Sequence, residues 1–430
     1  MIRTTPVNEA PCPCLVRPID LMGMGAPLEV TLGAVTDWTA LGERWRELEA
    51  RADASFFQSW SWIGCLGLER YDDPLLLEAR YGGRTIALGL FNRRRTWLFD
   101  TLFLHETGHA ELDTVFVEYN GLLIDDGTAD AASAAAGAGG SLQAICLAAA
   151  WRATLPHARL GRRLVLSGVD AAHLRAAGSV GQVSRLTTRA APILDLAALR
   201  SRGLGYENVL SANTRAQLRR SLRAYAALGT VAIRRAADTA EAHRFLDALA
   251  SLHRATWQRR GRQGAFAEPH FARFHHALID RALPRGEVEL WCVTAGAATI
   301  GYLYNFQYRG RVLAYQSGFD YTVADRRAKP GLTCHHMAIE RAAVEQRACY
   351  DFMAGDDRYK RSFSNAASSL HWLTAGANLD PIRLAGWVRV RSGRMVARLR
   401  PVLGQGARSA KRPHDLGTSS DRHCQPRIGP

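Results

Sequence analysis

Apolar residues recur along the chain at two spacings, and each spacing predicts a different kind of element. Between Asp37 and Leu48 they stand three and four positions apart, which predicts a helix that Asp37 caps. Further helices are predicted at residues 56–68, 142–151, 213–228, 241–259, 270–282 and 332–345.

Short apolar runs between glycine-containing turns predict strands. Gly82 and Gly83 separate the runs 75–81 and 85–91, which is typical of a β-hairpin. Nearer the C-terminus, three runs joined by glycine-containing turns predict an antiparallel meander at residues 288–294, 299–308 and 312–319. Further strands are expected at residues 97–103, 118–124, 164–166, 193–196, 231–234 and 350–353.

The order helix, helix, meander, helix and strand occurs twice along the chain. We therefore expect two tandem domains of mixed helix and sheet, at residues 28–180 and 181–380. A length of 430 residues agrees, because it exceeds what one hydrophobic core usually organises. Residues 1–27 show no period and are predicted to be a disordered leader. The Arg-, Gly- and Pro-rich residues 381–430 are predicted to be a basic, largely disordered tail.

Positive charge exceeds negative charge, since 55 Lys and Arg residues face 40 Asp and Glu residues, a formal net charge of +15. This excess suits an anionic ligand such as a phosphate, a nucleic acid or a membrane surface. The alternative is that the high arginine content follows from a GC-rich genome. A hydrophobic fraction of 47% indicates a globular chain rather than a disordered one.

The chain has no apolar run long enough to cross a membrane and no signal-peptide pattern. Its eight cysteines are scattered, and Cys12 and Cys14 lack a second pair with zinc-ligand spacing. We therefore expect a reduced, cytoplasmic protein. The alternative is a peripheral location at the inner membrane, through contact of the basic tail with its anionic surface.

A cationic turn leads into the last predicted helix. Arg326, Arg327 and Lys329 come directly before Pro330 and Gly331. Proline suits the first turn of a helix, and glycine lets a ligand approach the backbone. Because the free N–H groups and the dipole of a helix start favour anions, this turn predicts a pyrophosphate site. The alternative is a solvated basic turn before an ordinary helix.

Polar and aromatic residues alternate with apolar ones on two neighbouring strands of the meander. Tyr302 and Tyr304 fall on one face of the first strand, and the second strand carries Tyr315, Gln316 and Ser317. Such a face is unusual for a strand inside a sheet, so we expect it to line a groove that binds a ligand.

A third segment follows the strand predicted at residues 350–353. The strand leads through Gly355 to Asp356, and Tyr359 and Lys360 come next. Lys360 is one of only three lysines in an arginine-dominated chain, which indicates a need for a compact charge with a tunable pKa. The alternative is a surface ion pair between this lysine and one of the two preceding aspartates.

Together these segments resemble the GNAT superfamily of acyltransferases. The closer similarity is to the Fem-like branch with tandem GNAT-type domains, and within it to the CelD-like group linked to cellulose and exopolysaccharide biosynthesis. The similarity is carried by residues 302–306, 315–320, 330–331 and 350–360, and the last of these looks like that group's strand with its Gly-Asp-x-Tyr-Lys ending. It is clearest over residues 180–370 and weaker over 30–170.

The resemblance implies a fold of the α/β (α+β) class: two tandem GNAT-like domains, each a mixed, mostly antiparallel sheet flanked by helices. It implies acetyl-CoA or another acyl-CoA as co-substrate and no metal. The acceptor would be an amine or hydroxyl of a small molecule or saccharide. The implied co-substrate site comprises Arg326, Arg327, Lys329, Pro330, Gly331, Gln316 and Ser317.

The implied catalytic roles fall on six residues. A tyrosine would protonate the leaving thiolate, with Tyr359 the first candidate and Tyr315 the second. Asp320, Asp356 or Asp357 would orient or deprotonate the acceptor. Lys360 would bind an anionic group of the acceptor or stabilise the oxyanion.

Two other functions stay open. The turn at residues 327–333 keeps one glycine of the family's Arg/Gln-x-x-Gly-x-Gly/Ala loop, and an altered loop also fits Fem-like relatives that use aminoacyl-tRNA. The other is a non-catalytic accessory or nucleic-acid-binding protein, which the net charge and the arginine-rich tail would suit. Apart from these alternatives, nucleic acid is not expected as a partner.

Overall fold

The computed structural model describes residues 14–15, 28–96, 99–128, 141–153, 161–324, 327–355 and 357–376. The predicted leader, apart from residues 14–15, and the predicted tail lie outside the described residues. By their contacts, the described residues form one compact unit. We call residues 28–180 the N-terminal half and residues 181–376 the C-terminal half.

The first helix of the N-terminal half begins where the sequence predicts it. The carboxylate of Asp37 accepts hydrogen bonds from the N–H groups of Thr39 and Ala40, which would otherwise lack a partner at the start of α1. The elements of this half and the short strand before it are β1 (Cys14–Leu15), β2 (Leu28–Ala34), α1 (Trp38–Glu49), α2 (Trp60–Arg70), β3 (Pro74–Tyr81), β4 (Arg84–Arg95), β5 (Phe99–Leu104), β6 (Leu123–Ile124), α4 (Leu142–Ala153), β7 (Gly161–Val169) and α5 (Ala171–Gly178).

The C-terminal half repeats this order after a long connecting strand. Its elements are β8 (Val183–Asp195), α6 (Leu196–Ser201), α7 (Ala212–Ala226), β9 (Val231–Arg235), α8 (Thr239–Arg259), α9 (Pro269–Ala282), β10 (Val288–Ala295), β11 (Ala298–Tyr308), β12 (Arg311–Phe319), α10 (Pro330–Val344), β13 (Cys349–Asp351), α11 (Arg358–Phe363) and β14 (Ala366–Ala375). Each half thus has a strand, two helices, a three-stranded meander, a helix and a further strand.

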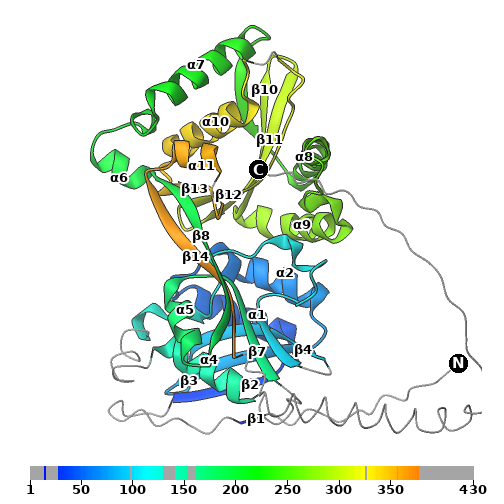
Figure 1. Cartoon of the computed structure of the whole chain (residues 1–430), viewed down its shortest axis with the longest axis vertical. Helices are drawn as coiled ribbons and strands as arrows, with labels where there is room; N and C mark the ends of the chain where they lie inside the picture. The colour runs from blue at the N-terminus through cyan, green and yellow to red at the C-terminus, as the bar shows by residue number, and fades with distance from the viewer. Residues whose placement is uncertain are drawn as a thin grey trace, which may run out of the picture. The chain divides into compact units, whose positions relative to one another are not determined.

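One continuous sheet runs through both halves, in the order β1-β2-β3-β4-β5-β7-β14-β8-β13-β12-β11-β10-β9, with β6 beside β4. Two pairs in it are parallel, β5 with β7 and β12 with β13, and the other pairs are antiparallel. The join is made by β8 and β14, which run side by side in Figure 1 as the green and orange strands. The predicted fold class is confirmed, because each half is a mixed, mostly antiparallel sheet flanked by helices.

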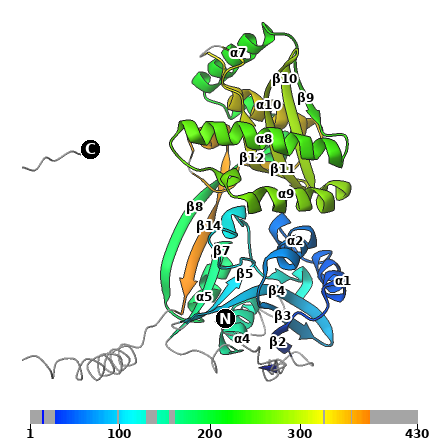
Figure 2. The same ribbon diagram turned by 90° about the vertical axis from the view of Figure 1, so that its right-hand side faces the viewer.

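The helices of the C-terminal half cover both faces of its sheet. Figure 2 shows α8 and α9 across β10–β12, and their apolar residues form a core with that face. α7 and α10 cover the opposite face around a separate core. The first core extends into the N-terminal half, because Phe56 stacks on Phe306 of β11 with ring centroids 4.2 Å apart. Among the described residues, no helix is both long and apolar enough to cross a membrane.

Two predictions about strands are wrong. The strand expected at residues 118–124 is reduced to β6, because Tyr119 has a positive φ angle that a strand does not allow. The groove expected along Tyr302 and Tyr304 is filled by α8 and α9. Tyr304 is fully buried there, and its hydroxyl lies 3.2 Å from Nδ1 of His275.

Candidate active site

Two parallel strands part in the C-terminal half and leave a fork in the sheet. β12 pairs with β13 only over Arg311–Leu313. Beyond Asp351 the chain stays with β8, because Phe352 and Gly355 donate their N–H groups to carbonyls of that strand. β12 meanwhile continues along β11 to its end. The edge of β12 over residues 314–319 therefore faces an opening instead of a neighbouring strand.

A β-bulge sits at the base of this fork. The register of β12 against β11 shifts between Ala314 and Gln316, which leaves Tyr315 as the extra residue. At Gly318, a Cβ atom would lie 2.4 Å from the carbonyl oxygen of Leu249 on α8. Glycine is therefore needed there for α8 to pack directly on the backbone of β12.

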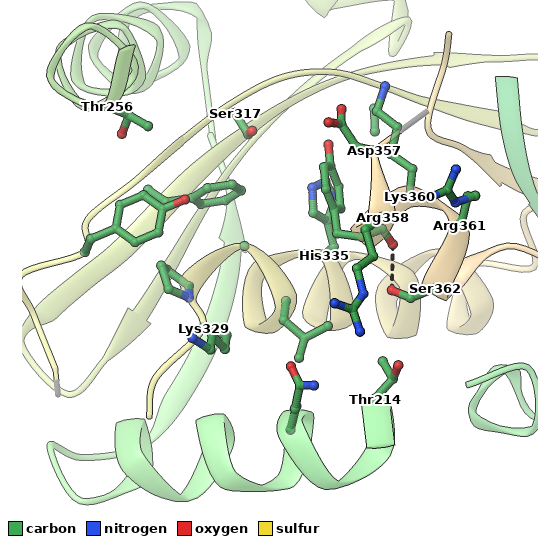
Figure 3. A pocket seen from close by; sticks show the side chains of 18 of the residues that line it. Thr214, Thr256, Ser317, Lys329, His335, Asp357, Arg358, Lys360, Arg361 and Ser362 are labelled. Atoms are coloured by element: carbon green, nitrogen blue, oxygen red, sulfur yellow. Dashed lines mark hydrogen bonds between the residues drawn. The ribbon is translucent and has the colours of Figure 1, made fainter. Parts of the chain in front are cut away.

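A cavity of about 900 Å³ opens from the fork. Its walls are the open edge of β12, the first turns of α7 and α10, the end of α8 and most of α11. Figure 3 shows Thr214, Thr256, Ser317 and His335 around this space, one each from α7, α8, β12 and α10. Arg358 of α11 reaches into the same space. The cavity thus collects side chains from five elements of the C-terminal half.

The start of α10 is open to the cavity. No side chain caps this helix, whose first residues Pro330 and Gly331 line the cavity wall. Ser221 of α7 fixes the position of the helix start, because its hydroxyl accepts the N–H of Lys329 at 2.8 Å and lies 2.8 Å from the hydroxyl of Thr333. Uncapped N–H groups at a helix start favour an anion.

His335 and Tyr359 form a stacked pair on the floor of the cavity, with ring centroids 5.5 Å apart. Nδ1 of His335 lies 3.1 Å from the hydroxyl of Tyr350, whereas its buried Nε2 has no hydrogen-bond partner among the described residues. Burial and the nearby charge of Lys360 lower the pKa of His335 to about 3, so the imidazole is neutral. Burial of its hydroxyl end and the Asp357 carboxylate raise the pKa of Tyr359, which keeps its proton.

Lys360 is held at the inner end of the fork. Its ammonium group donates to the carbonyl oxygens of Ala354 at 2.9 Å and Met353 at 3.4 Å. Burial lowers the pKa of Lys360, and the carboxylates of Glu118 and Asp357 act in the opposite direction. A partly desolvated ammonium fixed by two carbonyls is a positioned charge rather than a solvated one.

The structure brings most of the predicted site residues into this one cavity. Those that line it are Tyr315, Gln316, Ser317, Lys329, Pro330, Gly331, Asp357, Tyr359 and Lys360. Arg327 and Asp320 do not line it, and Arg326 and Asp356 lie outside the described residues. The alternative of a surface ion pair for Lys360 does not describe its contacts to the two carbonyl oxygens.

Two predicted residues have side chains engaged elsewhere. The hydroxyl of Tyr315 donates to the carbonyl of Val115 and lies 3.2 Å from Nε2 of His275, inside the core. The carboxylate of Asp320 accepts the N–H of Thr322 at 2.8 Å and its hydroxyl at 2.6 Å, and so closes the turn after β12.

His335, Arg358 and Trp257 are among the cavity residues that were not predicted from the sequence. His335 and His336 are adjacent on a predicted helix, and helical spacing does not say which one is buried. Arg358 and Trp257 lie in a motif-bearing segment and a predicted helix, where nothing in the sequence singles them out. The helical position of His335, one turn after Pro330 and Gly331, is the signal that could have found it.

Comparison with known proteins places a family match over the same region. Residues 212–361, from the start of α7 into α11, match the family described as "Acetyltransferase (GNAT) domain". The segment includes α7, α8, β12 and α10 and most of α11, the elements that wall the cavity. No curated protein sequence matches the chain.

Solved structures are similar over most of the chain. FemX superposes with a TM-score of 0.50 and 10% sequence identity, over 79% of this chain and 96% of that chain. A tandem GNAT protein from the clavulanic acid biosynthesis pathway gives a TM-score of 0.44 at 11% identity, over 81% of this chain and 99% of that chain. At such low identity the likeness to FemX concerns the fold alone. Residues 212–361 are therefore similar to a GNAT acetyltransferase domain.

Proposed function

We propose that this chain is an acyltransferase that moves an acyl group from acyl-CoA, acetyl-CoA being the simplest, to an amine or a hydroxyl. The open fork beside the uncapped start of α10 carries the proposal. It offers one place where a diphosphate and an extended thioester arm can bind together. The family match over residues 212–361 supports the same reading.

The donor would lie along three features of the cavity. The N–H groups at the start of α10, with the side chains of Lys329 and Arg358, would hold the diphosphate. The pantetheine arm would follow the open edge of β12 past Gln316 and Ser317, whose backbone groups have no strand partner on that side among the described residues. The thioester would then reach the base of the fork.

The reaction needs the acceptor to attack the thioester carbon, after which the carbon–sulfur bond breaks and the thiolate takes a proton. Tyr359 is the proposed donor of that proton, because its hydroxyl keeps its proton and the residue lines the cavity. Lys360 would stabilise the developing oxyanion or an anionic group of the acceptor. For the acceptor proton, Asp356 is a better candidate than Asp320, whose carboxylate is already bonded to Thr322.

The acceptor would enter along the α8 wall. Trp257 lines this wall, and the guanidinium of Arg260 lies over its ring at 5.5 Å from the centroid. Thr256 and His253 lie beside them. An aromatic ring with polar neighbours suits the apolar face and the hydroxyls of a sugar. We therefore propose a saccharide acceptor, in envelope or exopolysaccharide synthesis.

Calorimetric titration with CoA and acetyl-CoA tests the donor site. Wild type should bind both, and Lys329→Ala and Arg358→Ala should each weaken the Kd about tenfold, the effect of one lost charge-assisted contact. Arg244→Ala is the matched control, because Arg244 is exposed on α8 and does not line the cavity. It should bind as wild type does.

Other outcomes would overturn the proposal. If all four proteins bind CoA equally, CoA does not bind at the start of α10. If wild type binds no CoA, the hypothesis of an acyl-CoA donor is wrong. Binding of aminoacyl-tRNA without CoA would favour the Fem-like alternative. An affinity for nucleic acid that falls steeply as the salt concentration rises would favour a non-catalytic, nucleic-acid-binding function.

A further inference from the structure

The N-terminal half contains a counterpart of the fork, and its own chain closes it. β5 and β7 pair in parallel from Phe99 to Phe103 and then part, as β12 and β13 do. In the gap, the carboxylate of Glu106 accepts the hydroxyl of Ser167 at 2.6 Å. Asn120 bridges the gap, because its side chain donates to the carbonyl of Leu104 and its N–H donates to Gly168.

The helix after this closed fork is also capped. The N–H of Ala144, in the first turn of α4, donates to the hydroxyl of Ser141 at 3.2 Å. The matching helix of the C-terminal half, α10, has no side-chain cap. The N-terminal half thus has a closed fork and a capped helix where the C-terminal half has an open fork and an uncapped helix.

The chain that closes the N-terminal fork continues to the C-terminal one. Within residues 115–119, which we call the bridging loop, the carbonyl of Val115 accepts the hydroxyl of Tyr315 on the β12 arm. On the other arm, Glu118 accepts the N–H of Ala354 at 2.6 Å. Tyr119 donates its hydroxyl to Asp351 at 2.6 Å. One loop therefore contacts both arms of the open fork.

We propose that the bridging loop sets the separation of the two arms and that Glu118 and Tyr119 are positioning residues for acyl transfer, an inference that rests on the proposed function. Glu118 holds the N–H of Ala354, and Lys360 holds the carbonyl oxygen of the same residue. The loop thereby fixes the ammonium group at the base of the cavity, although none of residues 115–119 lines that cavity.

The carboxylate of Glu118 is buried among charged groups. Glu118 is only 8% exposed, and a buried carboxylate is costly unless a hydrogen bond or an opposite charge compensates it. Lys360 and Arg189 are its cationic neighbours, and Asp351 is an anionic one. The carboxylates of Glu118, Asp357 and Asp351 in turn raise the pKa of Lys360, against the effect of burial. Glutamine at position 118 could keep the hydrogen bond to Ala354 but not the charge, so Glu118→Gln separates these two contributions.

Competitive labelling tests this link without any ligand. The chain has three lysines, Lys329, Lys360 and Lys411, so mass spectrometry can follow each one during brief reaction with acetic anhydride. In Glu118→Gln, Lys360 should react about tenfold faster than in wild type at one fixed pH, because an ammonium that loses an opposite charge deprotonates more readily. Glu106→Gln, in the closed fork, is the matched control and should leave the rate unchanged.

CoA titration tests the consequence for the site. Glu118→Ala and Tyr119→Phe should weaken CoA binding about tenfold with circular dichroism unchanged, and Glu106→Gln should bind as wild type does. If wild type binds CoA and all variants bind equally, the inference is wrong while the proposed function stands. If Lys360 reacts equally in Glu118→Gln and wild type, the inference is wrong whether or not CoA binds. If wild type binds no CoA, the proposed function and its positioning residues both fail.

Discussion

Replacing Glu118 by glutamine should make the protein more stable at neutral pH and leave it unchanged in acid. Glutamine keeps an oxygen for the N–H of Ala354 but removes the charge, so it imitates the protonated carboxyl group. Burial raises the pKa of Glu118 from 4.5 to about 7, although the Ala354 N–H and the charges of Lys360 and Arg189 favour ionisation; Asp351 opposes it. Ionising this group therefore costs stability in the folded protein.

The sign and size of the stability difference between Glu118→Gln and wild type follow from that pKa. A carboxyl whose folded-state pKa is raised loses its favourable contribution as pH rises from the unfolded value to the folded one, here from 4.5 to about 7. Each tenfold change in an ionisation constant is worth about 1.4 kcal/mol, so the full effect is about 3 kcal/mol. Glu118→Gln should thus match wild type near pH 4 and exceed it by about 3 kcal/mol at pH 8.

Urea unfolding followed by tryptophan fluorescence at a series of pH values measures the difference. Glu106→Gln is the comparator, because burial and Asp113 raise the pKa of Glu106 to about 8 and its gain should continue to higher pH. The reasoning is refuted if the difference in free energy of unfolding between Glu118→Gln and wild type stays constant from pH 4 to 8. It is also refuted if that difference becomes smaller as the pH rises.

Three further results are expected. Phe306→Ala should lower the free energy of unfolding by about 3–5 kcal/mol in urea titrations, because Phe306 is fully buried against Phe56; a loss below about 1 kcal/mol would contradict the shared core. Gly318→Ala should lower Tm and weaken CoA binding, since its Cβ would meet the Leu249 carbonyl oxygen at 2.4 Å; unchanged Tm would contradict that contact. The imidazole of His335 should stay neutral from pH 8 down to 5 in nitrogen NMR spectra, because its pKa is lowered to about 3; a titration step near pH 6.5 would show that it is solvated.

Local patterns predicted the helices and the meander because their evidence lies within one segment. The spacing after Asp37 and the glycine turns between β10, β11 and β12 depend only on near neighbours. β14 was not predicted, because its strand partners β7 and β8 lie far away in the sequence. The continuous sheet depends on those pairings, and no local pattern contains them.

The residues of the candidate site also fall into those that a local pattern could predict and those that it could not. Pro330, Gly331, Tyr359 and Lys360 could be found, because each belongs to a motif of adjacent residues, and they do line one cavity. Glu118 could not, because it acts on Ala354 from a segment 236 positions away and has no motif of its own. The groove predicted along Tyr302 and Tyr304 was wrong, because alternation tells which face of a strand a side chain is on but not what covers that face.

Beyond Leu313 and Asp351 the two arms of the open fork share no ladder hydrogen bonds. The bridging loop contacts both arms from outside their own segment. The segment that matches the family, residues 212–361, includes neither this loop nor β8, against which β13 and residues 352–355 are aligned. It also lacks Phe56, on which Phe306 stacks. The N-terminal half, with its own fork closed, thus completes the site of its neighbour.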